Sequence, residues 1–140
     1  MTTLVIHAIA CTLMLGVIWI VQLVHYPAFE FIELNKSQKF HSMHSQNITV
    51  VVAPLMLTEF VTSVLLLYGN GHSWLLILNF FGVLAIWANT FLVMVPIHDK
   101  LAVSHDTHLA RRLVTMNWFR TLIWSMRWLI LIFMIYSKGV

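Results

Sequence analysis

The hydrophobic residues of this chain fall into four long runs that are separated by more polar stretches. The runs cover about residues 4–24, 48–68, 74–95 and 113–136. Each run is long enough to cross a bilayer as a helix, which takes roughly 20 apolar residues. The pattern predicts an all-α integral membrane protein, folded as a single up-down-up-down four-helix bundle over residues 1–140.

The composition agrees with a protein whose main partner is the lipid bilayer. Of the 140 residues, 60% are hydrophobic and only 9% are charged, whereas soluble domains carry about 25% charged residues. The eight Lys and Arg residues are scattered and are not interleaved with aromatic residues. The chain therefore lacks the basic patch of a nucleic-acid-binding protein. The single cysteine, Cys11, excludes an internal disulfide.

The prolines predict where two of the helices end. The residue before a proline disfavours the helical conformation, so Tyr26-Pro27 is expected to end the first helix. Residues 25–47, which mix Phe with Glu and Lys, would then lie along the lipid headgroups. Pro96 is expected to end the third helix in the same way.

The positive charges between the runs predict the orientation in the membrane. Lys36 and Lys39 lie in the first connection, and Lys100, Arg111 and Arg112 lie in the second long one. Connections rich in Lys and Arg stay in the cytoplasm. We therefore expect a multi-pass inner-membrane protein with both termini on the non-cytoplasmic side.

The fourth run carries a polar face that a lipid-facing helix would not have. At about 100° per residue, Asn117, Arg120, Trp124 and Arg127 share one side of a helix. A charged side chain at membrane depth costs roughly 2.5–3.5 kcal/mol, so such residues face a bundle interior or a wet cavity. Glu59 is the one acid in another apolar run, and we expect it to pair with Arg127, or with Arg120.

Two interpretations of these charged residues stay open. Glu59, Arg120 and Arg127 could be catalytic residues that act on a bound molecule. They could equally be a structural tie between helices. Under the first interpretation, other polar residues of the apolar runs would line the substrate pocket, namely Gln22, Asn89, Asn117 and Trp124.

Histidines gather at one predicted membrane face, although each alone would be an ordinary interfacial residue. His25 ends the first run, His41 and His44 precede the second, and His98 follows the third. Neutral imidazole suits zinc, copper and iron, so these four residues are candidate ligands of a metal ion, with iron or copper favoured. In a haem variant, His25 and His98 would supply both axial ligands. Two further histidines, His105 and His108, belong to the same face.

The histidines and Glu59 cannot bind one ion. His41 and Glu59 are eighteen residues apart, which is about 27 Å along an unbroken helix, whereas ligands lie within about 2.0–2.6 Å of their metal. The sequence therefore predicts two zones, a histidine cluster near the cytoplasmic rim and a polar pocket deeper in the bundle.

The last third of the chain resembles a known family. The stretch VPIHDKLA at 95–102, the Arg111-Arg112-Leu113 region and the stretch NWFRTLIWSMR at 117–127 are similar to the anthrone oxygenase-like family of small four-span membrane proteins. The resemblance implies a proline and polar turn after the third span and an Asn-Trp/Arg-Thr signature in the fourth. Some members of that family oxidise polycyclic phenolic substrates with dioxygen, so the resemblance also implies an oxygenase that acts on an apolar small molecule. His98 departs from the family pattern, in which Asn is expected.

Three hypotheses of function follow. The first is a membrane-embedded oxidoreductase with a histidine-ligated metal ion or haem and an apolar small-molecule substrate. The second is a non-enzymatic accessory subunit or assembly factor. The third is a small carrier or proton relay that uses Glu59. A homo-oligomer is compatible with each of them.

Overall fold

The structure is a computed structural model that describes residues 1–32, 34–69, 73–103 and 106–137. Every element in this part of the chain is helical, which confirms the predicted all-α class. In chain order the elements are α1 (Thr2–Ile20), the π-helix η1 (Val21–His25), α2 (Tyr26–Ala28), the short 3-10 helix η2 (Phe29–Phe31), α3 (Leu34–Gly69), α4 (Trp74–Asn89), the π-helix η3 (Thr90–Met94), α5 (Val95–Val103) and α6 (Thr107–Ser137).

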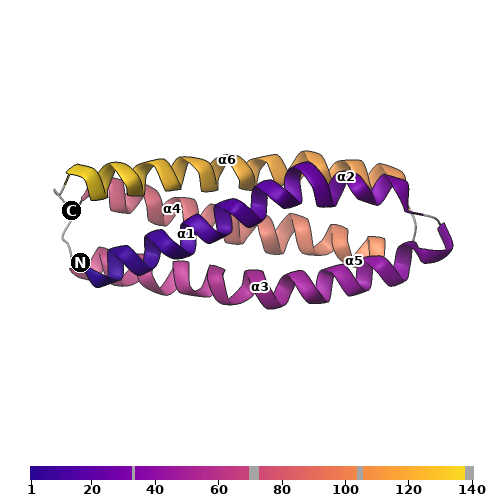
Figure 1. Ribbon diagram of the computed structural model, residues 1–140, viewed down its shortest axis with the longest axis horizontal. Helices are drawn as coiled ribbons and strands as arrows, with labels where there is room; N and C mark the ends of the chain where they lie inside the picture. Colours follow the sequence, from indigo (N-terminus) through magenta and orange to yellow (C-terminus); the bar gives the residue numbers. More distant parts are fainter. Residues whose placement is uncertain (33, 70–72, 104–105, 138–140) are drawn as a thin grey trace.

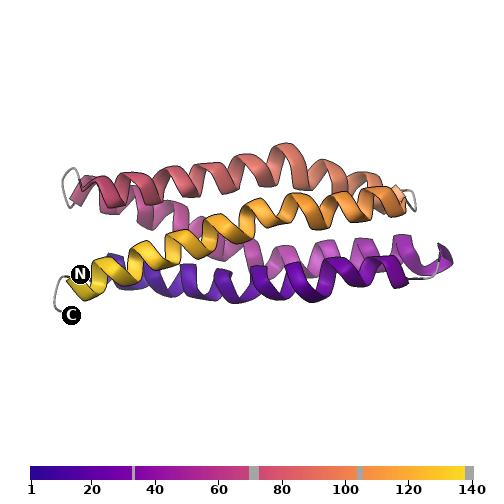
Figure 2. The same ribbon diagram turned by 90° about the horizontal axis from the view of Figure 1, so that it is seen from above.

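These elements join into four long rods that lie side by side (Figure 1 and Figure 2). Among the described residues, four stretches are long and apolar enough to cross a membrane: Thr2–Ala28, Lys39–Gly69, Trp74–Val103 and Thr107–Ser137. The first rod packs against α3 and α6, and the rod of α4 and α5 also packs against α3 and α6. The first and third rods therefore lie diagonally across the bundle. Both ends of the chain lie at the same end of the bundle (Figure 1).

Both predicted helix ends at prolines are wrong, because the helix continues through Pro27 in α2 and through Pro96 in α5. Each proline lies two residues after a π-helix. The N–H that closes η1, from Tyr26, donates to the carbonyl of Val21 five residues back. A proline clashes with the carbonyl four residues before it in a regular α-helix. Local π geometry is one way in which membrane helices accommodate a proline.

Each π-helix also shifts the buried face of its rod by one residue. Ile18 is buried, and a regular α-helix would return to the same face seven residues later, at His25. His25 is exposed instead, and Tyr26, eight residues on, is buried. The third rod repeats this shift, since Ile86 and Met94, eight residues apart, are both buried.

Most of the segment that was predicted to lie along the headgroups is helical. The second long helix therefore begins well before residue 48, where its apolar run begins. The helix α3 begins at Leu34 and runs unbroken to Gly69. Its first part is polar in sequence but amphipathic in the bundle, because Phe40 and Ile48 pack against the buried side chains of the other rods. Phe40 also contacts the ring of Phe29. These contacts bury one face of α3 in the part of the helix that precedes the apolar run.

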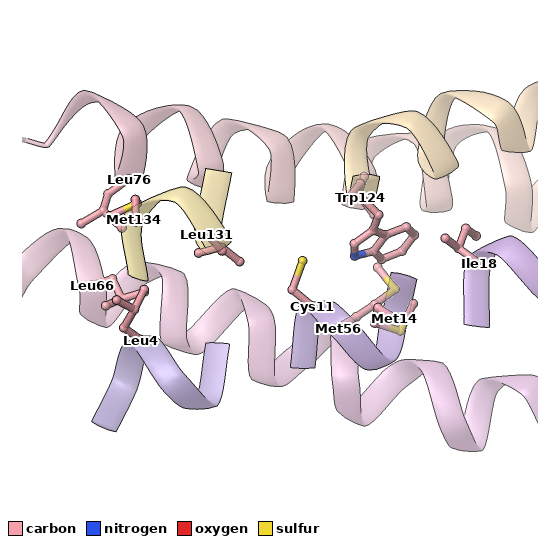
Figure 3. Packing of buried hydrophobic residues seen from close by; sticks show 11 residues of the cluster. Leu4, Cys11, Met14, Ile18, Met56, Leu66, Leu76, Trp124, Leu131 and Met134 are labelled. Carbon is pink, nitrogen blue, oxygen red and sulfur yellow. The ribbon is translucent and has the colours of Figure 1, made fainter. Parts of the chain in front are cut away.

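Two clusters of buried apolar side chains fill the bundle along its length. The cluster toward the chain ends includes Cys11, Met14, Met56 and Trp124 (Figure 3). The second cluster lies toward the other end and includes Tyr26, Phe29, Met94, Ile97, Leu101 and Leu113. Many large apolar side chains remain exposed on the outside of the rods, as expected for helices that face lipid. The expected functional residues lie among and between these two clusters.

Candidate functional site

Three imidazoles meet at the end of the bundle remote from the chain ends. His41 and His44 lie one turn apart on the buried face of α3, and His98 comes from α5. The ring centroid of His98 lies 5.2 Å from that of His41 and 6.4 Å from that of His44. The structure thus brings together three of the four histidines that the sequence suggested as metal ligands.

Buried nitrogen atoms without hydrogen-bond partners mark this histidine cluster. They are Nε2 of His41, Nε2 of His44 and Nδ1 of His98. Buried polar atoms in proteins are almost always paired, and an unpaired one calls for an explanation such as an ion or a water molecule. Three such atoms on neighbouring rings indicate that the cluster has unused capacity to bind a ligand.

Aromatic residues of the first rod hold the imidazoles in place. The hydroxyl of Tyr26 lies 3.1 Å from Nε2 of His98, within hydrogen-bonding distance. The ring of Phe29 lies 4.5 Å from that of His41 and 5.3 Å from that of His44, edge to face. This hydrogen bond leaves Nδ1 as the free nitrogen of His98.

The other predicted histidines are placed differently. His25 is exposed, and its ring lies 5.0 Å from that of His44 at the edge of the cluster. Gln22, three residues earlier in η1, is buried and so faces away from His25. His108 is exposed and makes no ring contact with the cluster. His105 lies outside the described residues.

The spacing of the rings bears on the metal prediction. Two imidazoles on one tetrahedral metal, with metal–nitrogen distances of about 2.0–2.1 Å, have centroids about 5 Å apart. The 5.2 Å between His41 and His98 matches that separation. As the side chains stand, however, no group of three or more His, Cys, Asp or Glu in the described part of the chain could hold a metal ion. Binding would require the imidazoles to turn about their side-chain torsions.

A cavity of about 270 Å³ adjoins the histidine cluster. His98 and Tyr26 line the cavity and also belong to the histidine cluster and its contacts, so the cavity and the cluster share these two side chains. Most of the wall is apolar and comes from all four rods, with Met14 and Met56 at one end. His25 does not line the cavity, so the haem variant with His25 and His98 as axial ligands has no shared cavity here.

Two charged residues line this cavity, Asp99 and Arg120, and Arg120 is the buried one. Its side chain is only 6% exposed, and its Nε has no hydrogen-bond partner. The guanidinium carbon lies 5.4 Å from the centre of the Trp124 ring, in a cation–π contact. None of the described acids forms an ion pair with it. Arg120 therefore belongs with the cavity rather than with the pair that was predicted for Glu59.

The predicted pair of Glu59 and Arg127 is confirmed as a contact. Nη2 of Arg127 lies 3.0 Å from Oε1 of Glu59, and both side chains are 2% exposed. The indole N–H of Trp124 donates to Oε2 of Glu59 at 3.0 Å. Because α3 is unbroken between His41 and Glu59, the two zones are separate, as expected from about 27 Å of helix.

Sequence reasoning missed half of this deep network. His7 lies within hydrogen-bonding distance of Thr62 Oγ1, at 2.7 Å, and of Asn79 Oδ1, at 3.0 Å. The side chain of Arg127 reaches His7 at 3.4 Å and Asn79 at 3.4 Å. The sequence does contain a signal for this network. Counting residues from the ends of the four apolar runs that lie near the chain termini places these residues at a similar depth in the bundle.

Glycine explains how the long side chain of Arg127 fits between the rods. A Cβ atom at Gly82 of α4 would lie 2.7 Å from Cδ of Arg127 and 2.9 Å from its Cγ. The missing side chain at Gly82 thus leaves the space that the stem of Arg127 occupies.

The remaining predicted pocket residues do not surround a common space. Gln22 accepts a hydrogen bond from Asn117 Nδ2 at 2.9 Å and donates to the carbonyl of Val114 at 3.2 Å. Asn89 is half-buried, and its Oδ1 has no partner. None of Gln22, Asn89, Asn117, Trp124, Glu59 and Arg127 lines the cavity. The cavity therefore shares no residue with the predicted substrate pocket, and of the predicted catalytic residues only Arg120 lines it.

The comparisons with known proteins leave this site to be interpreted from its own geometry. The likeness of residues 95–127 to the anthrone oxygenase-like family remains a prediction from short motifs. Neither a family model, nor a curated protein, nor a solved structure matches this chain.

Proposed function

We propose that the chain is an integral membrane protein with its four rods running up, down, up and down through the bilayer. Four apolar stretches of sufficient length support this proposal. The outward-facing side chains support it too, since residues such as Val50 and Leu92 are 76% exposed. Polar networks are enclosed while apolar side chains face outward, which is the arrangement expected in lipid. The Lys and Arg pattern favours non-cytoplasmic termini.

We further propose that the protein is a membrane-embedded oxidoreductase with its metal ion at His41, His44 and His98. The observation that carries this proposal is the set of three buried, unpartnered imidazole nitrogens, which come from two rods and lie beside a cavity. Iron and copper both bind imidazole well. When bound, such a metal would supply the electron-transfer chemistry.

The residues around the cluster have roles that do not depend on the metal. Tyr26 fixes the ring of His98 through its hydroxyl and so directs Nδ1 away from the phenol. Hydrogen bonds of this kind orient histidine ligands in metal sites. The cavity would hold an apolar small molecule next to His98, and the enclosing side chains would exclude water from it.

The network around Glu59 is better explained as a structural tie than as a proton relay. Its carboxylate is already occupied by Arg127 and by the indole of Trp124. All four rods contribute to the network through His7, Glu59, Asn79 and Arg127, so it joins the bundle at one level.

Metal analysis of the purified protein tests the proposal. After exposure to iron, copper or zinc and removal of free metal, the protein should retain about one metal ion per chain. The double variant His41→Ala with His44→Ala should lose it, because two of three ligands are gone. The matched control His108→Ala changes an exposed histidine outside the cluster and should retain it.

The absorption spectrum separates the two cofactor predictions. A Soret band would identify haem, whereas bound iron or copper without that band would identify a mononuclear site. A wild-type protein that retains no metal and no haem would contradict the proposal and favour the accessory-subunit hypothesis.

A further inference from the structure

We infer that the cavity beside His98 takes an apolar molecule with an anionic head group, and that Arg120 binds this head. The inference rests on the cavity of the proposed function and names the chemical class of its ligand. It does not depend on the metal ion, because Arg120 belongs to α6 and is not one of the proposed ligands.

The charges of the two buried arginines are balanced differently. Arg127 is neutralised by Glu59 at 3.0 Å. Arg120, seven residues earlier on the same face of α6, forms no ion pair with a described acid. The groups that interact with its guanidinium include the phenol of Tyr26 and the ring face of Trp124, and both are uncharged. An anionic ligand would supply the counter-charge that this buried guanidinium lacks.

The geometry of Arg120 fits a ligand that bears a carboxylate. Nε is buried and unpaired, and the side chain lines the cavity. A guanidinium presents its N–H groups in a planar fork that matches the two oxygens of a carboxylate. Tyr26 and His98 line the cavity as well and add hydrogen-bonding groups close to Arg120. Asp99, also in the lining, is exposed and lies on α5 toward the rim.

The rest of the cavity fits the apolar body of such a molecule. Its volume of about 270 Å³ lies just below the usual range of about 300–1,000 Å³ for small-molecule sites. Its wall includes Met14, Val21, Met56 and Met94, which offer no hydrogen bonds. A short alkyl chain or a single ring system matches this volume and this lining.

The exposed lining residues show where the cavity opens. Ala53 belongs to α3, Phe91 to η3 and Val95 to α5, and all three are exposed. Thr49 of α3 and Asp99 of α5 line the cavity and are exposed as well. The opening therefore lies between α3 and the rod of α4 and α5, and its exposed lining is apolar at Ala53, Phe91 and Val95 and polar at Thr49 and Asp99. A molecule dissolved in the bilayer reaches the cavity from this side with its head directed inward to Arg120.

Binding of decanoate and decanol to chelator-treated protein in lipid nanodiscs, measured by isothermal titration calorimetry, tests the inference. The two probes have the same chain and differ in charge. Decanoate should bind at least tenfold more tightly than decanol, which corresponds to about 1.4 kcal/mol. Arg120→Gln should weaken decanoate binding at least tenfold, and Arg120→Lys should weaken it less because the charge remains. The control Arg112→Gln alters an exposed arginine outside the cavity and should bind as the wild type does.

Each alternative outcome counts against the inference. Equal binding of decanol and decanoate by the wild type, no binding of either, or unchanged decanoate binding by Arg120→Gln would overturn it. The comparison of the two probes uses the wild type and remains decisive even if Arg120→Gln does not fold. Because metal is removed beforehand, a failed metal analysis leaves this measurement intact, and decanoate binding can fail while the metal is retained.

Discussion

The pair of Glu59 and Arg127 gives the sharpest test of how this bundle is held together. Glu59→Ala removes the partner of a guanidinium that is 2% exposed, and breaking a buried pair in this way costs about 3–5 kcal/mol. The same change also leaves the indole of Trp124 without its acceptor, but an interhelical hydrogen bond in a membrane protein is worth only about 0.6 kcal/mol on average. The stranded charge should therefore dominate the loss.

This reasoning predicts an order of stability for four variants in detergent. Glu59→Gln keeps an acceptor near Trp124 and should therefore lose less stability than Glu59→Ala. The double variant Glu59→Ala with Arg127→Ala leaves no buried charge unpaired, so its loss of stability should be smaller than the sum of the losses of the two single variants. A coupling energy of about 0.5–3 kcal/mol is typical of residues in contact. At roughly 2–4 °C per kcal/mol, Glu59→Ala should lower the melting temperature by about 6–20 °C.

Thermal melting followed by circular dichroism measures all of these variants under one condition. Met126→Ala is the matched control, since Met126 precedes Arg127 on α6 and is 60% exposed, and it should melt close to the wild type. Strictly additive losses in the double variant would refute the reasoning, because they would mean that the two side chains do not stabilise each other.

Two other predictions follow from the same packing and from the charge pattern. Gly82→Ala should lower the melting temperature by several degrees, because the new methyl group displaces the stem of Arg127; the size of the loss should shrink when Arg127→Ala is already present, and an undiminished loss would mean that Gly82 acts through another contact. In intact cells, a membrane-impermeant thiol reagent should label Ser73→Cys and should not label Thr107→Cys. The native Cys11 is buried and should not be labelled. Labelling of Thr107→Cys from outside would reverse the proposed orientation.

The sequence predicted the helices and the deep ion pair because both depend on simple regularities. A charge in an apolar run needs a partner, and Glu59 was the one acid available at a similar depth to Arg127. His41 and His44 lie three residues apart, and this spacing places both on one face of a helix. These relations hold within a helix or along the membrane normal, where 1.5 Å per residue fixes position.

The features that the sequence concealed depend on departures from regular helix geometry. A proline motif such as Tyr26-Pro27 normally predicts a helix end, and nothing in the local sequence reveals that a π-helix will precede it. His25 was predicted as a ligand, whereas the structure leaves it exposed and buries Tyr26 instead. Arg120 was assigned to Glu59 because its isolation becomes evident only when the cavity beside it is known.

The length of α3 implies that water-soluble and lipid-soluble molecules reach the protein by different routes. With 36 residues, this helix is about 54 Å long, while the hydrocarbon core of a bilayer is about 30 Å thick. When Glu59 lies near the middle of the hydrocarbon core, His41, about 27 Å away along the helix, lies beyond the core, which extends about 15 Å to either side of its centre. Chelators and metal ions would exchange with His41 and His44 from the aqueous phase, on a time course set by their concentration in solution. A ligand of the cavity would instead arrive at a rate set by its concentration in the lipid.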